Sequence, residues 1–166
     1  MKALLALVVL VLVAGCGAAD PPAADPTPTV ASSSTPPAKQ LSPEQTVRAW
    51  VQGYNRFAQT GAEARVDQLT ASGCAMCRSL TGSVAQVINA GGGYRGGDWV
   101  VVKAKVASRH DDTTIVDAAV RANAGWTKEA AGEPFKRFGS DRYILEFTVR
   151  RWPDGTMQVQ KLVSLS

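Results

Sequence analysis

The sequence predicts an α+β domain in which N-terminal helices pack on a curved antiparallel four-stranded sheet. Three observations support this fold class. Apolar residues recur at spacings of three and four after residue 41, and after Gly96-Gly97 the pattern changes to alternation of apolar and polar residues. Turn residues separate the alternating stretches. Helices followed by an antiparallel meander place the helices against one face of the sheet.

Three helices are expected. The sequence Ser-Pro-Glu-Gln at residues 42–45 is typical of a capping box with proline in the first turn, and the helix it begins should run to about Thr60 and end at Gly61. A shorter helix is expected over Ala62–Leu69. A third is expected over Ala75–Asn89 and should end at the following glycines.

Four strands are expected after the helices. They cover Trp99–Ala107, Thr113–Ala122, a stretch through Tyr143–Val149, and Met157–Leu165. A turn is expected at residues 109–112, another at Pro153-Asp154-Gly155, and a long polar connection over residues 123–141.

The glycine-rich stretch GGGYRGGDW spans residues 91–99. It lacks the Lys-Ser/Thr ending of a phosphate-binding loop. We therefore interpret it as the end of a helix followed by a flexible turn, with Tyr94, Arg95 and Trp99 as a candidate contact patch.

The N-terminus has the features of a secretory signal. Lys2 is the only charge before Asp20, and residues 3–14 are all apolar, which is too short for a membrane span of roughly 20 residues. The sequence at residues 13–16, Val-Ala-Gly-Cys, resembles the lipobox of bacterial lipoproteins. The resemblance implies cleavage before Cys16 and acylation of that residue, which would anchor the chain durably to lipid. An ordinary signal peptide is the alternative.

The domain organisation follows from these segments. Residues 1–15 are the expected signal peptide, and residues 16–40 are the expected lipidated cysteine with a disordered tether rich in proline, serine and alanine, in which O-linked sugars are conceivable. Residues 41–166 contain all the tryptophans and form a single domain of ordinary size. The expected location is the outer face of the cell membrane.

The charge balance is mildly basic. The formal net charge is +4 for the full chain and falls to +3 once Lys2 is removed. The basic residues are scattered along the chain, unlike the concentrated basic stripe of nucleic-acid-binding proteins, so no nucleic-acid partner is expected. Membrane lipid, reached through acylated Cys16, is the expected partner, together with an envelope protein, a wall component or a small apolar ligand.

From residue 42 to the C-terminus the domain resembles a family of actinobacterial lipoproteins built on the nuclear-transport-factor-2-like, or SnoaL-like, cone. The resemblance is carried by Asn55, Ala58, Thr60 and Gly61, by the Cys-Ala-Met-Cys sequence at residues 74–77, and by the glycine stretch at residues 91–99. The family has no assigned activity, so the resemblance implies a fold and a location but no reaction.

Cys74 and Cys77 are expected to form a disulfide. With Cys16 acylated they remain as a pair outside the membrane, where thiols oxidise, and residues three apart in a first helical turn lie within bridging distance. A redox-active pair is the first alternative, although the pair follows a helix rather than the strand of a thioredoxin motif. A metal site is the second, and it lacks further ligands apart from His110.

No residue pattern identifies a catalytic site, a metal or a cofactor. His110, the only histidine of the chain, lies in an expected turn and is interpreted as solvent-exposed. The cone fold implied by the resemblance often encloses a pocket, and some relatives use a pocket Asp, Tyr or His for isomerase or dehydratase chemistry. The candidate pocket or contact residues are Tyr54, Tyr94, Arg95, Trp99, Asp117 and Tyr143, although Asp117 is expected to face solvent rather than the pocket.

Two functional hypotheses remain. The first is a non-catalytic binding or interaction module, which uses the cone mouth or the loops at residues 94–99 and 125–138. The second is a pocket enzyme of isomerase or dehydratase type. A buried carboxylate facing a tyrosine in an open cavity would favour the enzyme, whereas a sealed or wholly apolar cavity would favour binding.

Overall fold

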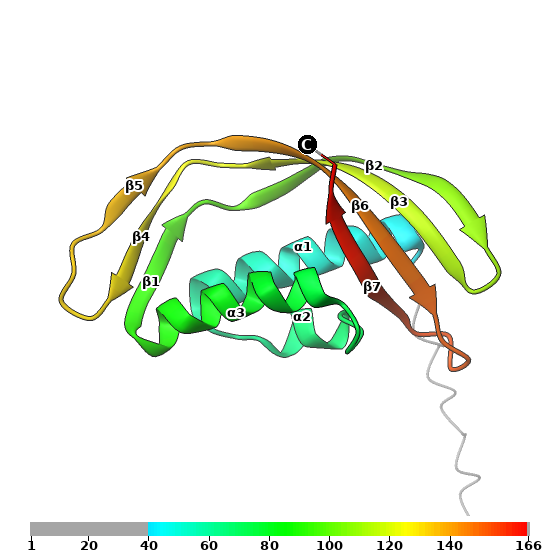
Figure 1. Cartoon of the computed structure of the whole chain (residues 1–166), viewed down its shortest axis with the longest axis horizontal. Helices are drawn as coiled ribbons and strands as arrows, with labels where there is room; N and C mark the ends of the chain where they lie inside the picture. The colour runs from blue at the N-terminus through cyan, green and yellow to red at the C-terminus, as the bar shows by residue number, and fades with distance from the viewer. Residues whose placement is uncertain (1–39, 166) are drawn as a thin grey trace, which may run out of the picture. The chain divides into compact units, whose positions relative to one another are not determined.

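The computed structural model describes residues 40–165 (Figure 1). The expected signal peptide, Cys16 and almost all of the tether lie outside these residues. The helices come first: α1 (Pro43–Thr60), α2 (Ala64–Gln68) and α3 (Ala75–Asn89). The strands follow: β1 (Gly91–Gly96), β2 (Trp99–His110), β3 (Thr113–Ala122), β4 (Gly125–Ala130), β5 (Lys136–Phe138), β6 (Asp141–Arg151) and β7 (Met157–Ser164). The predicted α+β class is confirmed.

Helix α1 begins and ends at the predicted residues. The Ser42 hydroxyl accepts a hydrogen bond from the Gln45 backbone N–H at 3.2 Å, and the Gln45 side chain accepts one from the Ser42 N–H at 2.8 Å, which completes the capping box. At the other end Gly61 adopts a left-handed φ of 73° and donates its N–H to the Phe57 carbonyl at 2.8 Å. A left-handed residue favours glycine, which explains the end of the helix.

The strands form two antiparallel sheets, and the chain passes back and forth between them. The four predicted strands make one sheet in the order β2-β3-β6-β7, and a second sheet has the order β1-β4-β5. Strand β1 leads into β2, β3 into β4 and β5 into β6, so three ribbons run through both sheets and bend between them (Figure 1). The bend lies at Gly97-Asp98, Asn123-Ala124 and Gly139-Ser140.

The second sheet corrects two sequence predictions. The glycine-rich stretch was expected to be a turn, but its first six residues form β1, which pairs with β4. The connection over residues 123–141 was expected to be irregular, but it contains β4 and β5. Glycine is required in β1 for a steric reason: a Cβ at Gly92 would collide with the backbone carbonyl oxygen of Lys128. The glycines therefore permit close strand pairing here.

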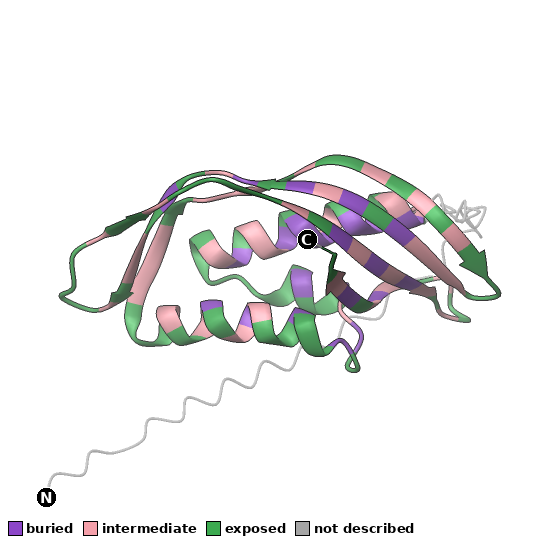
Figure 2. Cartoon of the chain, turned by 45° about the horizontal axis from the view of Figure 1, so that its top comes forward, coloured by how far each residue is buried: buried purple, intermediate pink, exposed green. Residues whose placement is uncertain are grey.

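The hydrophobic core lies between the helices and the concave face of the four-stranded sheet (Figure 2). Trp50 of α1 and Phe147 of β6 are fully buried and meet edge to face, with ring centroids 5.9 Å apart. Helix α2 is shorter than expected, and Val66 within it and Leu69 directly after it are buried. Within residues 40–165, no helix is both long enough and apolar enough to cross a membrane.

Candidate functional site

A cavity of about 550 Å³ opens at the bend between the two sheets. Helix α1 forms one wall and α3 another, and the strands contribute the rest of the lining at β1, at β4 and around the bend, where β2, β3, β5 and β6 begin or end. We call this cavity the bend pocket. Its position follows from the topology, because the bend turns the ends of both sheets toward the two helices.

All three tyrosines of the chain line the bend pocket: Tyr54 from α1, Tyr94 from β1 and Tyr143 from β6. Burial raises the pKa of Tyr54 to about 12, and the neighbouring phenols of Tyr94 and Tyr143 add to the shift. Burial, with a smaller effect of Glu129, raises the pKa of Tyr94. Burial also raises the pKa of Tyr143, as does the adjacent Asp141 carboxylate. The pocket therefore presents three neutral phenols at physiological pH.

The aromatic side chains of the pocket continue the hydrophobic core. Trp50 and Tyr54, one helical turn apart, stack with centroids 5.8 Å apart and planes 6° from parallel. The Tyr54 ring lies 5.1 Å from that of Trp99, and the Trp99 ring lies 5.7 Å from that of Tyr143. We call these four residues the aromatic stack. The stack runs from the buried core to the pocket wall, so the core and the pocket wall are in direct packing contact through these four side chains.

Polar side chains of α1 hold the bend in place. The Asn55 amide donates to the Trp99 carbonyl at 2.8 Å and accepts from the Trp99 N–H at 2.9 Å. One turn later, the Gln59 amide donates to the Asp98 carboxylate. Gly97 adopts a left-handed φ of 79°, and a Cβ there would lie 2.5 Å from the Phe138 ring. Only glycine allows this approach.

The charged groups of the pocket lie at its rim. Asp98, Glu129 and Asp141 contribute carboxylates to the lining, and Glu129 and Asp141 are exposed. Among the residues that the structure describes, none of those that line the pocket is a lysine, arginine or histidine. The arrangement thus combines neutral phenols and aromatic faces inside with negative charge at the mouth.

Four of the six candidate pocket residues line the bend pocket: Tyr54, Tyr94, Trp99 and Tyr143. Arg95 does not. It alternates with Tyr94 along β1, is exposed, and places its guanidinium 4.0 Å from the centroid of the Phe135 ring. The predicted contact patch of Tyr94, Arg95 and Trp99 is therefore divided between two faces.

Asp117 and His110 lie away from the pocket. Asp117 is exposed on the outer face of the four-stranded sheet, where its strand neighbours are Lys105 and Glu146. The expectation that it faces solvent is correct, and it is not a pocket residue. His110 ends β2 and is exposed, as predicted.

Sequence reasoning did not identify the rim carboxylates or Phe138 as individual site residues, although Asp98, Glu129 and Phe138 fall within the two loops that it named as binding regions. They lie in connections and at strand ends, which only the fold brings together. A signal for the α1 side existed: Tyr54 and Ala58, and likewise Asn55 and Gln59, are four residues apart and therefore share one helix face beside the buried face.

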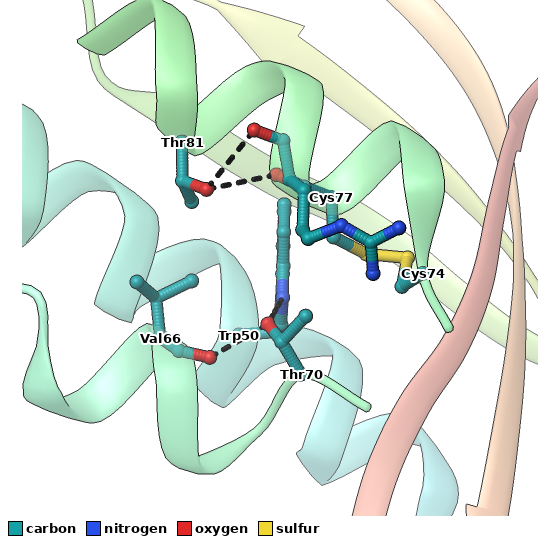
Figure 3. The surroundings of a disulfide bond; sticks show 7 residues. Trp50, Val66, Thr70, Cys74, Cys77 and Thr81 are labelled. Carbon is teal, nitrogen blue, oxygen red and sulfur yellow. Dashed lines mark hydrogen bonds between the residues drawn. A yellow bond between two sulfur atoms is a disulfide. The ribbon is translucent and has the colours of Figure 1, made fainter. Parts of the chain in front are cut away.

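Cys74 and Cys77 are joined by a disulfide at the start of α3, with Cα atoms 5.3 Å apart (Figure 3). The two cysteines are 1% and 0% exposed. Around them, Trp50 donates its indole N–H to Thr70 at 2.9 Å, and the Thr81 hydroxyl lies 3.2 Å from the Cys77 carbonyl. Thiol–disulfide exchange needs an accessible sulfur. Burial therefore supports the structural bridge over the redox pair.

A metal-binding cluster is also absent from the part of the chain that the structure describes. No three His, Cys, Asp or Glu side chains there are close enough to hold an ion.

Comparison with known proteins gives the fold but no family. No family model and no curated protein matches the sequence. Among solved structures, the intermembrane space region of the chloroplast protein ARC6 aligns over 74% of this chain and 93% of its own, with a TM-score of 0.56 and 16% identity. This similarity shows a shared fold alone.

Two further structures align less closely. Aln2 from a Streptomyces species has a TM-score of 0.46 and 12% identity, over 76% of this chain and 93% of its own. An Ntf2-like protein involved in plasmid conjugation has a TM-score of 0.42 and 12% identity, over 73% of this chain and 46% of its own. No argument rests on these two. The helices against the concave side of a curved sheet are consistent with the cone that the sequence resemblance implies.

Proposed function

We propose that this chain is an extracytoplasmic lipoprotein whose domain binds a small ligand in the bend pocket. The observation that carries the proposal is the convergence of three neutral phenols on one cavity of about 550 Å³. Cavities of this size, mostly apolar with a few converging polar groups, are typical ligand sites. A phenol both donates and accepts a hydrogen bond, so the three can orient a ligand without charge.

Binding is favoured over catalysis by the position of the carboxylates. A general base needs a shielded cleft and a partner that shifts its pKa. Glu129 and Asp141 are exposed at the rim instead, and Asp98 accepts a hydrogen bond from Gln59. An isomerase or dehydratase would have to use Asp141, which is hydrogen-bonded to Tyr143, or Glu129, which lies near Tyr94.

The lipid anchor is part of the proposal. The lipobox-like sequence before Cys16, and the sequence resemblance to actinobacterial lipoproteins, support acylation of Cys16 and display of the domain outside the membrane. The buried disulfide is consistent with an oxidising compartment. The tether would then hold the bend pocket clear of the lipid surface.

The pocket can be tested by blocking it. The full chain is captured from intact cells, and the small molecules that co-purify are identified by mass spectrometry. Ala58→Trp should fill the cavity from α1, whereas Gln52→Trp adds the same side chain at an exposed position of the same helix. We expect a ligand with the wild type and the Gln52 variant and none with the Ala58 variant. Identical recovery from all three chains would contradict the proposed site.

The anchor is tested separately. Mass measurement of the mature chain should show diacylglyceryl and acyl groups on Cys16, and an inhibitor of signal peptidase II should leave an uncut precursor. Cys16→Ser should remove the modification. A mature chain that begins with an unmodified residue would contradict the lipoprotein assignment and leave the pocket proposal standing.

A further inference from the structure

The charge of the bend pocket differs from that of the chain. The chain has 18 lysines and arginines against 14 acidic residues. The pocket lining nevertheless includes three carboxylates, Asp98, Glu129 and Asp141, and no basic residue among the described lining residues. A mildly basic protein thus has an acidic pocket mouth.

Two cations on the strands around the pocket are engaged elsewhere. The Arg95 guanidinium lies over the Phe135 ring on the other side of β1. Lys136 of β5 places its ammonium 3.7 Å from Glu129 and 3.9 Å from Glu133, between two carboxylates. Lys136 therefore balances part of the charge of Glu129. Asp98 and Asp141 contact neutral donors instead, the Gln59 amide and the Arg142 backbone N–H.

The inner wall of the pocket is built of aromatic side chains. Tyr54, Trp99 and Tyr143 belong to the aromatic stack, and Phe138 lies against Gly97 at the bend. Aromatic faces carry negative electrostatic potential and attract a cation within about 6 Å of the ring centroid. The three phenols are neutral at pH 7, as tyrosines with an ordinary pKa also are, and can accept hydrogen bonds from an ammonium group; burial raises the pKa of each further.

From the aromatic wall and the uncompensated rim carboxylates, we infer that the bend pocket binds an organic cation, an ammonium group joined to an apolar body. This inference rests on the proposed binding function and adds the class of ligand. The ammonium group lies against the tyrosine and tryptophan rings below Asp98 and Asp141, and the apolar body fills the remainder of the cavity. An anion would be repelled by the same carboxylates, and a neutral molecule would gain no charge–charge attraction from them.

Three probes with one apolar body test the assignment. At pH 7 the first, 4-tert-butylbenzylamine, is a cation. The second, 4-tert-butylbenzyl alcohol, is neutral, and the third, 4-tert-butylbenzoate, is an anion. Each is titrated by calorimetry into the full chain in non-ionic maltoside micelles, with empty micelles subtracted. The amine should bind about tenfold more tightly than the alcohol, and the benzoate should bind most weakly. Of the three probes, only the amine should bind more weakly when salt is added.

A pair of double variants isolates the rim charge. Asp98→Asn/Asp141→Asn removes two carboxylates and keeps the oxygens that accept from Gln59 and from the Arg142 N–H. Asp117→Asn/Glu146→Gln removes the same charge from the outer face of the sheet. The first variant should lower the affinity for the amine by about three- to tenfold and leave that for the alcohol unchanged. The second should change neither.

The outcomes separate this inference from the proposed function. If the alcohol or the benzoate binds as tightly as the amine, the cation assignment is wrong and a binding pocket remains. If the pocket variant and the outer-face variant lower the affinity for the amine equally, the rim carboxylates do not recognise the amine. If none of the three probes binds, the cation assignment is wrong, and the binding function is then judged by the co-purification experiment alone.

Discussion

The side-chain amide of Asn55 satisfies both backbone hydrogen-bonding groups of Trp99, accepting from its N–H at 2.9 Å and donating to its carbonyl at 2.8 Å. Asn55 lies in α1 and Trp99 is the first residue of β2, so this pair joins the helix to the sheet just after the bend. The pair also places the Trp99 ring against Tyr54. The shape of the pocket therefore depends on one asparagine.

Replacing Asn55 with alanine should leave the N–H and carbonyl of Trp99 without these partners in a half-buried position. Unmet hydrogen bonds of this kind cost about 1–3 kcal/mol. We expect Asn55→Ala to lower the free energy of unfolding by about 2 kcal/mol in urea titration. Gln52→Ala, on the exposed face of the same helix, should change it by less than about 0.5 kcal/mol. Equal effects would show that the amide pair does not hold the bend.

Tyrosinate absorbance reports on the pocket alone, because all three tyrosines of the chain line it. Burial raises the pKa of each, that of Tyr54 to about 12. The native chain should therefore titrate above the ordinary value of about 10 seen in denaturant. Tyr54→Phe should remove the latest step. A native titration that coincides with that of the unfolded chain would contradict the buried position of the phenols.

The same shift predicts a loss of stability at high pH. The pKa of Tyr54 is raised in the folded chain, so its contribution to stability is fully present below the unfolded value of about 10 and is lost as the pH rises through about 12. Unfolding free energies measured between pH 9 and pH 12 should fall steeply for the wild type. They should fall less for Tyr54→Phe, which keeps the ring. An equal slope in both chains would assign the alkaline loss to other groups.

Two glycines inside helices should respond oppositely to alanine. In α3, a Cβ at Gly82 meets nothing within 4 Å, so Gly82→Ala should stabilise by roughly 0.5–1 kcal/mol through helix propensity. In α1, a Cβ at Gly53 would lie 3.1 Å from the Val66 backbone nitrogen of α2. We expect Gly53→Ala to be at least about 1 kcal/mol less stable than Gly82→Ala in thermal or urea unfolding. Equal stabilisation would show that α2 shifts without cost.

Removing the disulfide should destabilise the domain only modestly. The bridge between Cys74 and Cys77 closes a very short loop, for which the loss of chain entropy corresponds to about 2 kcal/mol. Cys74→Ala/Cys77→Ala should lower the free energy of unfolding by about that amount and leave the far-ultraviolet spectrum unchanged. In the native wild type, dithiothreitol should reduce the buried bond slowly. Rapid alkylation of these cysteines under native reducing conditions would revive the redox hypothesis.

The sequence predicted most of the helices and half of the sheet structure. Local signals were strong where they depend on neighbouring residues, as at the capping box of Ser42 and the terminal Gly61. Strands β1, β4 and β5 were missed because a glycine-rich stretch and a polar connection are typical of turns. The requirement for Gly92 arises from Lys128 on a partner strand, a long-range contact that no local pattern records.

The pocket was predicted by residue type but not by its charge. The tyrosines were identified as candidates because the cone implied by the resemblance often encloses a pocket with polar groups, and Trp99 because it ends the glycine-rich stretch. The rim carboxylates were missed, since Asp98 and Asp141 are far apart in the sequence and meet only where the ribbons bend. The direction of Arg95 could be derived from strand alternation only once β1 was known to be a strand.

The aromatic stack joins the wall of the bend pocket to the hydrophobic core. Trp50 packs on Phe147 at one end of the stack and Tyr143 borders the cavity at the other. A molecule bound in the pocket as proposed would pack on this wall in the native chain and would have no equivalent site in the unfolded chain. By mass action, a free ligand concentration of about a hundred times the dissociation constant raises the free energy of unfolding by about 2.7 kcal/mol. The melting temperature can therefore be used to screen a compound library, because a molecule that binds the pocket should raise it.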